Sequence, residues 1–301
     1  MDAVKTRSFV EPCPGTPGRR ELPRLAMNAV QAGQGRPVVF IHGLGWDHSL
    51  WGGAMTRLLD RYLTIAGDTR GHGASDKPEG PYSVDLFADD WADLISSLTD
   101  EKVLIVGFSL GGMIAQTLAL EHPDRVGALV LVNTSCRSPA HGQAHMKARM
   151  SAMQDKGPQA AAMLAAESVF SKAWRDAHPT ELADFVDWRV AQDHRALGEA
   201  MRAASSFDVC DRVGALGVPV LVITALGDEL MAPADQALLR TLIPHAEYAE
   251  IDRSGHMVPI EQAEAFEQAL EAFLARHWPS AGEANDGAAA ARVDGIEEVP
   301  Q

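Results

Sequence analysis

Short apolar runs alternate with stretches of helical spacing through the first half of the chain. Apolar runs of strand length occupy residues 37–41, 63–66, 103–106 and 128–132, and stretches with helical spacing occupy 49–62, 85–98 and 113–120. Runs that are apolar throughout are typical of strands buried on both faces of a sheet. The alternation therefore predicts an α/β fold, a mostly parallel sheet covered by helices on both faces.

The alternation stops near Ser138 and resumes at Pro219. The intervening residues are rich in Ala, Met, Trp and charge and poor in β-branched types, which predicts three or four helices. A strand at 220–223 and helices at 234–243 and 262–276 then restore the pattern. Because ligands of such sheets bind at the carboxyl ends of the strands, we expect the insertion to lie there. The predicted division is a core of residues 25–138 and 209–278 with a helical cap of residues 139–208.

Both ends of the chain have a different composition. Residues 1–24 are rich in Pro, Gly and charge and predict an irregular arm. Residues 279–301 are mostly Ala, Gly and acidic residues, with too few large apolar side chains to offset the entropy of ordering. We expect a disordered acidic tail there.

Charge and cysteine content narrow the class of protein. The formal net charge is −15, and no basic stripe occurs, which argues against a nucleic-acid partner. No run approaches the roughly 18 apolar residues of a membrane helix, and no leader is evident. Cys13, Cys136 and Cys210 have no metal-ligand spacing, so we interpret them as idle thiols in a reducing, cytoplasmic compartment.

A candidate nucleophile lies between the apolar run at 103–106 and the helix that follows it. Gly107-Phe108-Ser109-Leu110-Gly111-Gly112 has the G-x-S-x-G pattern of a nucleophile elbow. The serine of an elbow sits on a strained turn, and glycines flank it because a Cβ would collide with neighbouring backbone. Without this context the same letters would describe an ordinary glycine-rich turn with an idle serine. In this context they indicate Ser109 as a nucleophile.

A serine hydroxyl needs a histidine base to accept its proton. His256 follows the apparent last strand and precedes the closing helix, so its loop can reach the carboxyl edge of the sheet. His42 and His72 precede the serine and suit structural hydrogen bonds in turns. Four histidines of the insertion are interpreted as surface or pocket-lining groups: His141, His145, His178 and His194.

The histidine in turn needs a carboxylate that fixes its tautomer. Asp228 lies just beyond the strand at 220–223, which places it at the same edge as Ser109 and His256. Glu229 is the competing carboxylate, but it follows one position later. Asp252 is interpreted as a solvated residue at a strand end.

The tetrahedral intermediate of acyl transfer needs hydrogen-bond donors for its oxyanion. The backbone N–H of Leu110, directly after the serine, is one candidate, and that of Leu44 in the turn 42–46 is the other. Taken alone, residues 42–46 are better interpreted as a plain glycine-rich loop, and it is the elbow at Ser109 that favours an oxyanion turn. Neither a metal nor an organic cofactor is expected.

Together these motifs resemble the α/β-hydrolase superfamily over about residues 25–277. His42–Gly45 resembles its oxyanion turn, Gly67–Asp76 its structural D-x-R-G-x-G-x-S segment, and Gly255–Glu261 its C-terminal histidine segment. Within the superfamily, residues 68–83 and 131–134 are most similar to the 3-oxoadipate enol-lactonase group and its esterase relatives. The resemblance implies a serine hydrolase acting on a small-molecule ester or lactone.

The substrate itself is left open by the sequence. Trp46, Phe108 and Met257 are near the candidate triad and are predicted to form the pocket wall. Substrates from a small enol-lactone to a large macrolactone fit the pattern. Two alternatives remain: a cofactor-free perhydrolase or haloperoxidase with the same triad, and a ligand receptor with a vestigial one.

Overall fold

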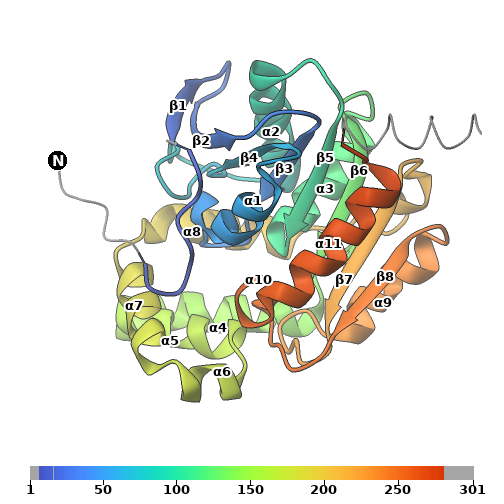
Figure 1. The fold of residues 1–301 in the computed structure, drawn as a ribbon. Coiled ribbons are helices and arrows are strands. Elements are labelled where there is room, and N and C mark those ends of the chain that lie inside the picture. Colours follow the sequence, from blue (N-terminus) through green and yellow to red (C-terminus); the bar gives the residue numbers. More distant parts are fainter. Residues whose placement is uncertain (1–6, 16, 281–301) are drawn as a thin grey trace, which may run out of the picture.

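One eight-stranded sheet forms the centre of the protein in the computed structural model, which describes residues 7–15 and 17–280 (Figure 1). Its strands are β1 (Gly18–Glu21), β2 (Ala26–Ala32), β3 (Pro37–Ile41), β4 (Leu63–Gly67), β5 (Val103–Phe108), β6 (Val126–Val132), β7 (Val220–Ala225) and β8 (Glu247–Ile251). The spatial order is β1-β2-β4-β3-β5-β6-β7-β8. Strands β3 to β8 are parallel, whereas β1 pairs antiparallel with β2 and β2 with β4. The predicted α/β class and mostly parallel sheet are therefore confirmed.

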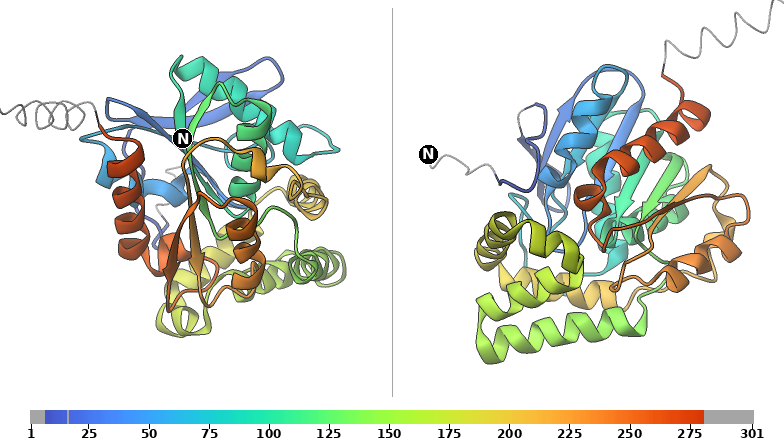
Figure 2. Two further views of the ribbon diagram at one scale, coloured as in Figure 1. Left: turned by 90° about the vertical axis from the view of Figure 1, so that its right-hand side faces the viewer. Right: turned by 60° about the horizontal axis from the view of Figure 1, so that its bottom comes forward.

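Helices cover both faces of the sheet, as the buried apolar strands require (Figures 1 and 2). One face packs against α1 (Gly52–Leu58) and α11 (Ala263–His277), and the other against α2 (Val84–Leu98), α3 (Leu110–Glu121) and α9 (Pro233–Leu242). Successive side chains of β3 point to opposite faces of the sheet. Val38 and Phe40 pack in the core on the side of α1 and α11, and Val39 and Ile41 pack in the core on the side of α2, α3 and α9. Short turns of helix complete the core at η1 (His48–Trp51), η2 (Val213–Ala215) and α10 (Val258–Glu261). Among residues 7–15 and 17–280, no helix combines the length and the apolar character needed to span a bilayer.

The segment between β6 and β7 forms five helices in the described chain, one or two more than predicted. They are α4 (Ala140–Lys156), α5 (Pro158–Val169), α6 (Lys172–Ala177), α7 (Pro179–Val190) and α8 (His194–Ser205). We call α4–α8 the helical insertion. The extra breaks occur where Gly157 adopts a positive φ of 85° and where Pro158 and Pro179 begin new helices. Figure 1 shows the insertion beyond one end of the central strands, which is the end at which β5 and β7 finish.

The N-terminal segment is more ordered than the sequence predicts. Strand β1 lies inside the predicted irregular arm. The Phe9 ring is buried against Trp46, which follows β3, and against Phe185 in the segment between β6 and β7. Strand β1 was not predictable from its residues, because Gly18–Glu21 contains no apolar side chain and is defined only by its pairing with β2. The predicted acidic tail lies, from residue 281 on, outside the described residues.

The interpretation of all three cysteines as idle thiols is wrong. Cys136 and Cys210 form a disulfide, with Cα atoms 4.9 Å apart and a sequence separation of 74 residues. Only the fold brings them together, at the point where the chain leaves the sheet for the helical insertion and returns from it. Cys13 is a free thiol, and burial raises its pKa to about 12.

Candidate active site

Ser109 occupies the sharp turn between β5 and α3. Its φ of 53° is unusual for a residue with a side chain, and the turn is enforced by tight packing. A Cβ on Gly107 would lie 2.4 Å from the Gly111 carbonyl oxygen, and one on Gly111 would lie 2.1 Å from that of Ile41. The hydroxyl of Thr134 donates to the Ser109 carbonyl at 2.9 Å. These glycines allow the strand, the turn and α3 to approach closely enough to project Ser109 from the sheet edge.

Asp228 and His256 meet at the same edge, beyond β7 and β8. Oδ2 of Asp228 lies 2.7 Å from Nδ1 of His256, and both residues are about 2% exposed. The other carboxylate oxygen accepts the backbone N–H groups of Leu230 and Met231 at 2.9 and 2.8 Å. The carboxylate is therefore fixed in direction and favours the tautomer that protonates Nδ1 and leaves Nε2 as an acceptor. Glu229, the competing carboxylate, is exposed.

The loop that carries His256 is fixed by two side chains that the sequence reasoning did not select. Asn133 donates from Nδ2 to the His256 carbonyl at 2.7 Å, and its Oδ1 accepts the Ala225 N–H at 2.8 Å. Glu261 accepts the backbone N–H groups of Gly255 and of Ser171 at 3.1 and 3.2 Å. Asn133 is a polar residue directly after the buried strand β6, and this position is the feature of the sequence that could have identified it as a site residue.

A small cavity of about 40 Å³ joins the candidate residues under the helical insertion. Its lining includes Ser109 and His256. Trp46 and Phe108 also line it, as predicted for the pocket wall, and the Phe108 ring lies 4.9 Å from the His256 ring. Met257 differs from its prediction: its side chain is fully buried in the core and is not part of the lining. Its side chain packs in the core between the sheet and α11, and its N–H donates to the Val169 carbonyl at 3.1 Å.

Leu44 and Leu110 both line this cavity. Within the described chain, neither backbone N–H donates to a protein acceptor. Leu110 also begins α3, so its N–H lies at the positive end of a helix dipole. Arg189 and Gln192 of the insertion hold the adjacent turn by donating to the Gly45 carbonyl, Gln192 at 2.9 Å.

The other histidines near the edge are structural. Nδ1 of His42 donates to the Gly43 carbonyl at 2.8 Å, while its Nε2 accepts the Thr69 N–H at 2.9 Å. His72 is bonded through Nδ1 to the Arg70 carbonyl at 3.0 Å. Burial lowers the pKa of both, that of His72 to about 3, so both rings are neutral near pH 7. Their roles agree with the turn hydrogen bonds expected for them.

The histidines of the insertion also have structural contacts. His178 stacks on Trp174 with ring centroids 4.7 Å apart, and His194 is bonded to the Val190 carbonyl at 3.0 Å. His145 lies 3.3 Å from the Ser168 hydroxyl, and His141 lies 3.6 Å from a carboxylate oxygen of Asp235. None of the four lines the cavity that contains Ser109.

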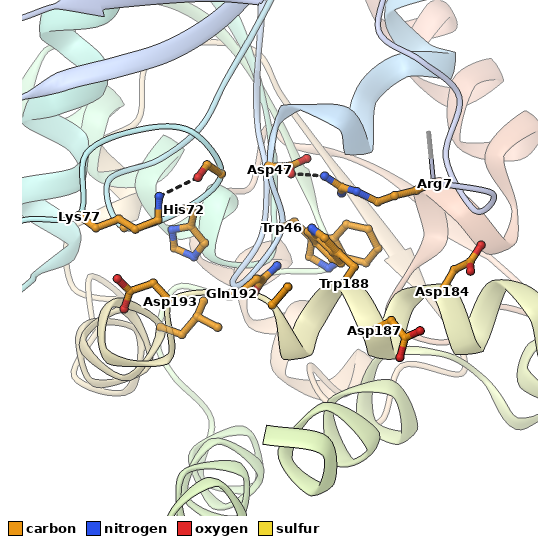
Figure 3. A pocket seen from close by; sticks show the side chains of 14 residues that line it. Arg7, Trp46, Asp47, His72, Lys77, Asp184, Asp187, Trp188, Gln192 and Asp193 are labelled. Carbon is orange, nitrogen blue, oxygen red and sulfur yellow. Dashed lines mark hydrogen bonds and ion pairs between the residues drawn. The ribbon is translucent and has the colours of Figure 1, made fainter. Parts of the chain in front are cut away.

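A larger cavity of about 810 Å³ is shown in Figure 3. It lies between α7 of the insertion and the turns after β3 and β4, and Trp46 lines both cavities. Its wall carries charges of both signs, including Lys77 and Asp193. Figure 3 shows Arg7 paired with Asp47 at one side of this cavity.

Asp47, His48 and Asp68 are close enough together to suggest a metal site. Their atoms are already engaged: Asp68 accepts from both the backbone N–H and Nδ1 of His48 at 2.8 and 2.7 Å, and Asp47 pairs with Arg7. Burial alone would raise the pKa of Asp68, but the hydrogen bonds and charge of His48 hold it below its usual range. The cluster thus fixes the turn after β4.

Comparison with known proteins gives a consistent result. The family model of the alpha/beta hydrolase fold matches residues 36–263. The 3-oxoadipate enol-lactonase 2 of Acinetobacter baylyi is 30% identical over 256 residues, which cover 84% of this chain and 94% of that protein.

Two solved structures are similar over most of this chain. The enol-lactonase from Burkholderia xenovorans LB400 has a TM-score of 0.80 at 26% identity, covering 86% of this chain and all of that one. The N-acyl homoserine lactone degrading enzyme Est816 has a TM-score of 0.75 at 26% identity, covering 85% of this chain and all of that one.

Proposed function

The chain belongs to the alpha/beta hydrolase fold family, and from this premise we propose that it is a serine hydrolase of carboxylic esters or lactones. The observation that carries the proposal is the position of Ser109. It lies on a strained turn at the start of α3 and lines one cavity with His256, whose ring is bonded to Asp228. These positions support the roles of Ser109 as nucleophile, His256 as its base and Asp228 as the acid that orients the base.

In the first half of the reaction, Oγ of Ser109 attacks the carbonyl carbon and its proton passes to Nε2 of His256. Asp228 stabilises the imidazolium through Nδ1, and the N–H groups of Leu44 and Leu110 hold the oxyanion. Collapse of the intermediate breaks the bond to the alcohol oxygen, which leaves with the proton from His256. The acyl group is then bonded to Ser109.

In the second half, water attacks the acyl carbon and gives its proton to His256. The new tetrahedral intermediate collapses, the bond to Oγ breaks, and the proton returns to Ser109 as the acid leaves. For a lactone, the alcohol and the acid are parts of one product. Every proton is carried by His256, so the cycle needs only water and the substrate.

The restriction to esters and lactones rests on the relatives. Two of those described above carry enol-lactonase in their names, and a third is described as degrading a lactone. The small cavity at Ser109 suits the reacting carboxyl group alone. The remainder of the substrate has to extend into neighbouring space under the insertion.

Hydrolysis of p-nitrophenyl esters, from acetate to long acyl chains, tests the proposal. Ser109→Ala should lower kcat by about 10⁴-fold or more while the protein remains folded by circular dichroism. The chain-length preference of the wild type then measures the space available to the acyl group. Comparable turnover by the folded Ser109→Ala variant would overturn the mechanism.

A further inference from the structure

Two arginines of the helical insertion are buried without a counter-ion. Arg149 of α4 and Arg189 of α7 are 4% and 5% exposed. Neither forms an ion pair with any carboxylate in residues 7–15 and 17–280. Burial lowers the pKa of Arg189, and the positive charge of Arg149 lowers it further. A buried charge without a partner is costly, so such a pair is unusual in a folded protein.

The two guanidinium groups differ in what they contact. Arg189 has neutral partners, because Nη1 donates to the Gly45 carbonyl and, at 3.1 Å, to Oε1 of Gln192. Arg149 has no hydrogen-bond partner among the described residues, and its Nε is fully buried. Burial lowers the pKa of Arg149 to about 10, which still leaves it charged at neutral pH. Its donors are therefore available to a ligand.

Arg149 is also placed where a substrate would meet it. It lines the small cavity that contains Ser109 and His256, and it lines a second cavity of about 320 Å³ between helices of the insertion. The side chain thus stands at the boundary between the reacting group and further space.

The second cavity has a charge opposite to that of the whole chain. The net charge of the protein is −15, yet none of the described Asp or Glu residues lines this cavity. Its basic lining residues are Arg149, Arg189, His194, Arg195 and Arg202, and its apolar lining includes Met150, Met153, Leu197 and Met201. Arg195 lies 3.9 Å from a carboxylate oxygen of Asp193, and Arg202 pairs with Glu199, so the unpaired charge is concentrated at Arg149 and Arg189.

We propose that Arg149, with Arg189 beside it, binds a carboxylate carried by the substrate, so that the substrate is an anionic ester or lactone whose charged end points away from Ser109. This inference rests on the proposed function and specifies its substrate class. A planar guanidinium fork matches a carboxylate, and the single charge of a carboxylate balances the unpaired Arg149. The methionines beside it accept the apolar chain between the two carboxyl groups.

Paired substrates that differ only in charge test the proposal. Mono-p-nitrophenyl adipate and suberate place the carboxylate on the acyl side, and 3-carboxy-4-nitrophenyl acetate places it on the alcohol side. The neutral partner of each is its methyl ester. We expect the wild type to prefer at least one anionic member over its methyl ester.

The variants are Arg149→Met and Lys147→Met. Lys147 is exposed on the same helix two residues away, so its substitution removes the same charge without touching the cavity. Arg149→Met should lower kcat/KM for the preferred anionic substrate by about 10- to 100-fold, the value of a charge-assisted hydrogen bond, and change the neutral ester less than about threefold. Lys147→Met should change neither by more than about threefold. A merely structural arginine would lower both rates together.

Equal losses for the anionic and neutral ester in Arg149→Met, with hydrolysis still dependent on Ser109, would overturn this inference and leave the proposed function intact. Stimulation of neutral-ester hydrolysis by free acetate would assign the arginines to a separate anion and would also overturn it. If no ester is turned over, calorimetry on Ser109→Ala with monomethyl adipate decides. Binding that is lost in the Ser109→Ala, Arg149→Met double variant supports the inference, and absence of binding contradicts it.

Discussion

At the residue scale, one buried amide joins three parts of the candidate site. Asn133 accepts from the Ala225 N–H of β7 and donates to the His256 carbonyl, and it does so from a φ of 45° directly after β6. Asparagine tolerates this left-handed conformation better than most residues. We interpret Asn133 as a positioning residue that acts through the His256 loop.

Asn133→Ala should therefore affect both stability and catalysis. Losing two buried hydrogen bonds should lower the free energy of unfolding by about 2–4 kcal/mol, measured by urea denaturation. The value of kcat should fall more than KM rises, because the His256 ring loses its fixed position. Asn28→Ala is the control, since Asn28 is buried and bonded to Asp68, away from His256. If both variants alter kcat equally, Asn133 has no specific positioning role.

Some residues of the candidate site could be predicted from the sequence, and others could not. Ser109, Asp228 and His256 could be selected because each follows a strand that ends at one edge, and chain order alone brings them there. Arg149 could not be selected, because its burial depends on how α4 packs against other helices of the insertion, and Lys147 beside it is exposed. Met257 was misplaced because nearness in sequence to His256 does not determine which side of the loop faces the cavity.

At the element scale, the disulfide Cys136–Cys210 closes the helical insertion at its base. The two residues flank α4–α8, and the adjacent Arg137 and Asp208 form an isolated β-bridge. Cross-links across long loops stabilise mainly by limiting the unfolded chain. For a loop of 74 residues, the chain-entropy relation gives about 4 kcal/mol.

Replacing both cysteines by alanine should therefore lower the free energy of unfolding by about 2–4 kcal/mol. Denaturation of the Cys136→Ala, Cys210→Ala variant measures this, and reduction of the wild type should reproduce it. Cys13→Ala, which removes the free thiol, is the matched control. Alkylation of three thiols in the unreduced, unfolded protein would show that the bond is absent.

Strands that are buried on both faces of the sheet could be predicted from the sequence. Strand β2 and the separate helices of the insertion could not. Strands β3 and β5 contain no polar side chain and β7 contains only Thr224, so their composition alone identifies them. Strand β2 contains Asn28 and Gln31 and was missed, although its pairing with β4 buries most of it. Helices of the insertion were undercounted because short helices separated by a single residue, as α4 and α5 are at Gly157, leave one continuous helical pattern.

At the scale of the whole molecule, buried neutral histidines couple stability to pH. Burial lowers the pKa of His42 and His72, while each would titrate near 6.5 in the unfolded chain. Below that pH the unfolded state binds protons that the folded state does not. The stabilising effect is thus complete above about pH 6.5 and is lost progressively as the pH falls toward the folded-state pKa, about 3 for His72.

The free energy of unfolding should therefore fall between pH 8 and pH 5, by about 2 kcal/mol through His72 and further through His42. In His72→Asn the pH dependence should be shallower by that amount, because one titrating group is removed. His245→Asn, at an exposed histidine, should retain the wild-type slope. Urea denaturation at several pH values measures both, and an unchanged slope in His72→Asn would contradict the assignment.

The most direct test of the central claim, that Ser109 is the nucleophile, is covalent labelling with a fluorophosphonate followed by peptide mass spectrometry. The reagent loses fluoride as phosphorus bonds to an activated serine oxygen. We expect a single adduct on Ser109, none in Ser109→Ala, and much slower labelling in Asp228→Asn, whose amide cannot orient His256 as the carboxylate does. An adduct on another serine, or ester hydrolysis at the wild-type rate by folded Ser109→Ala, would contradict it.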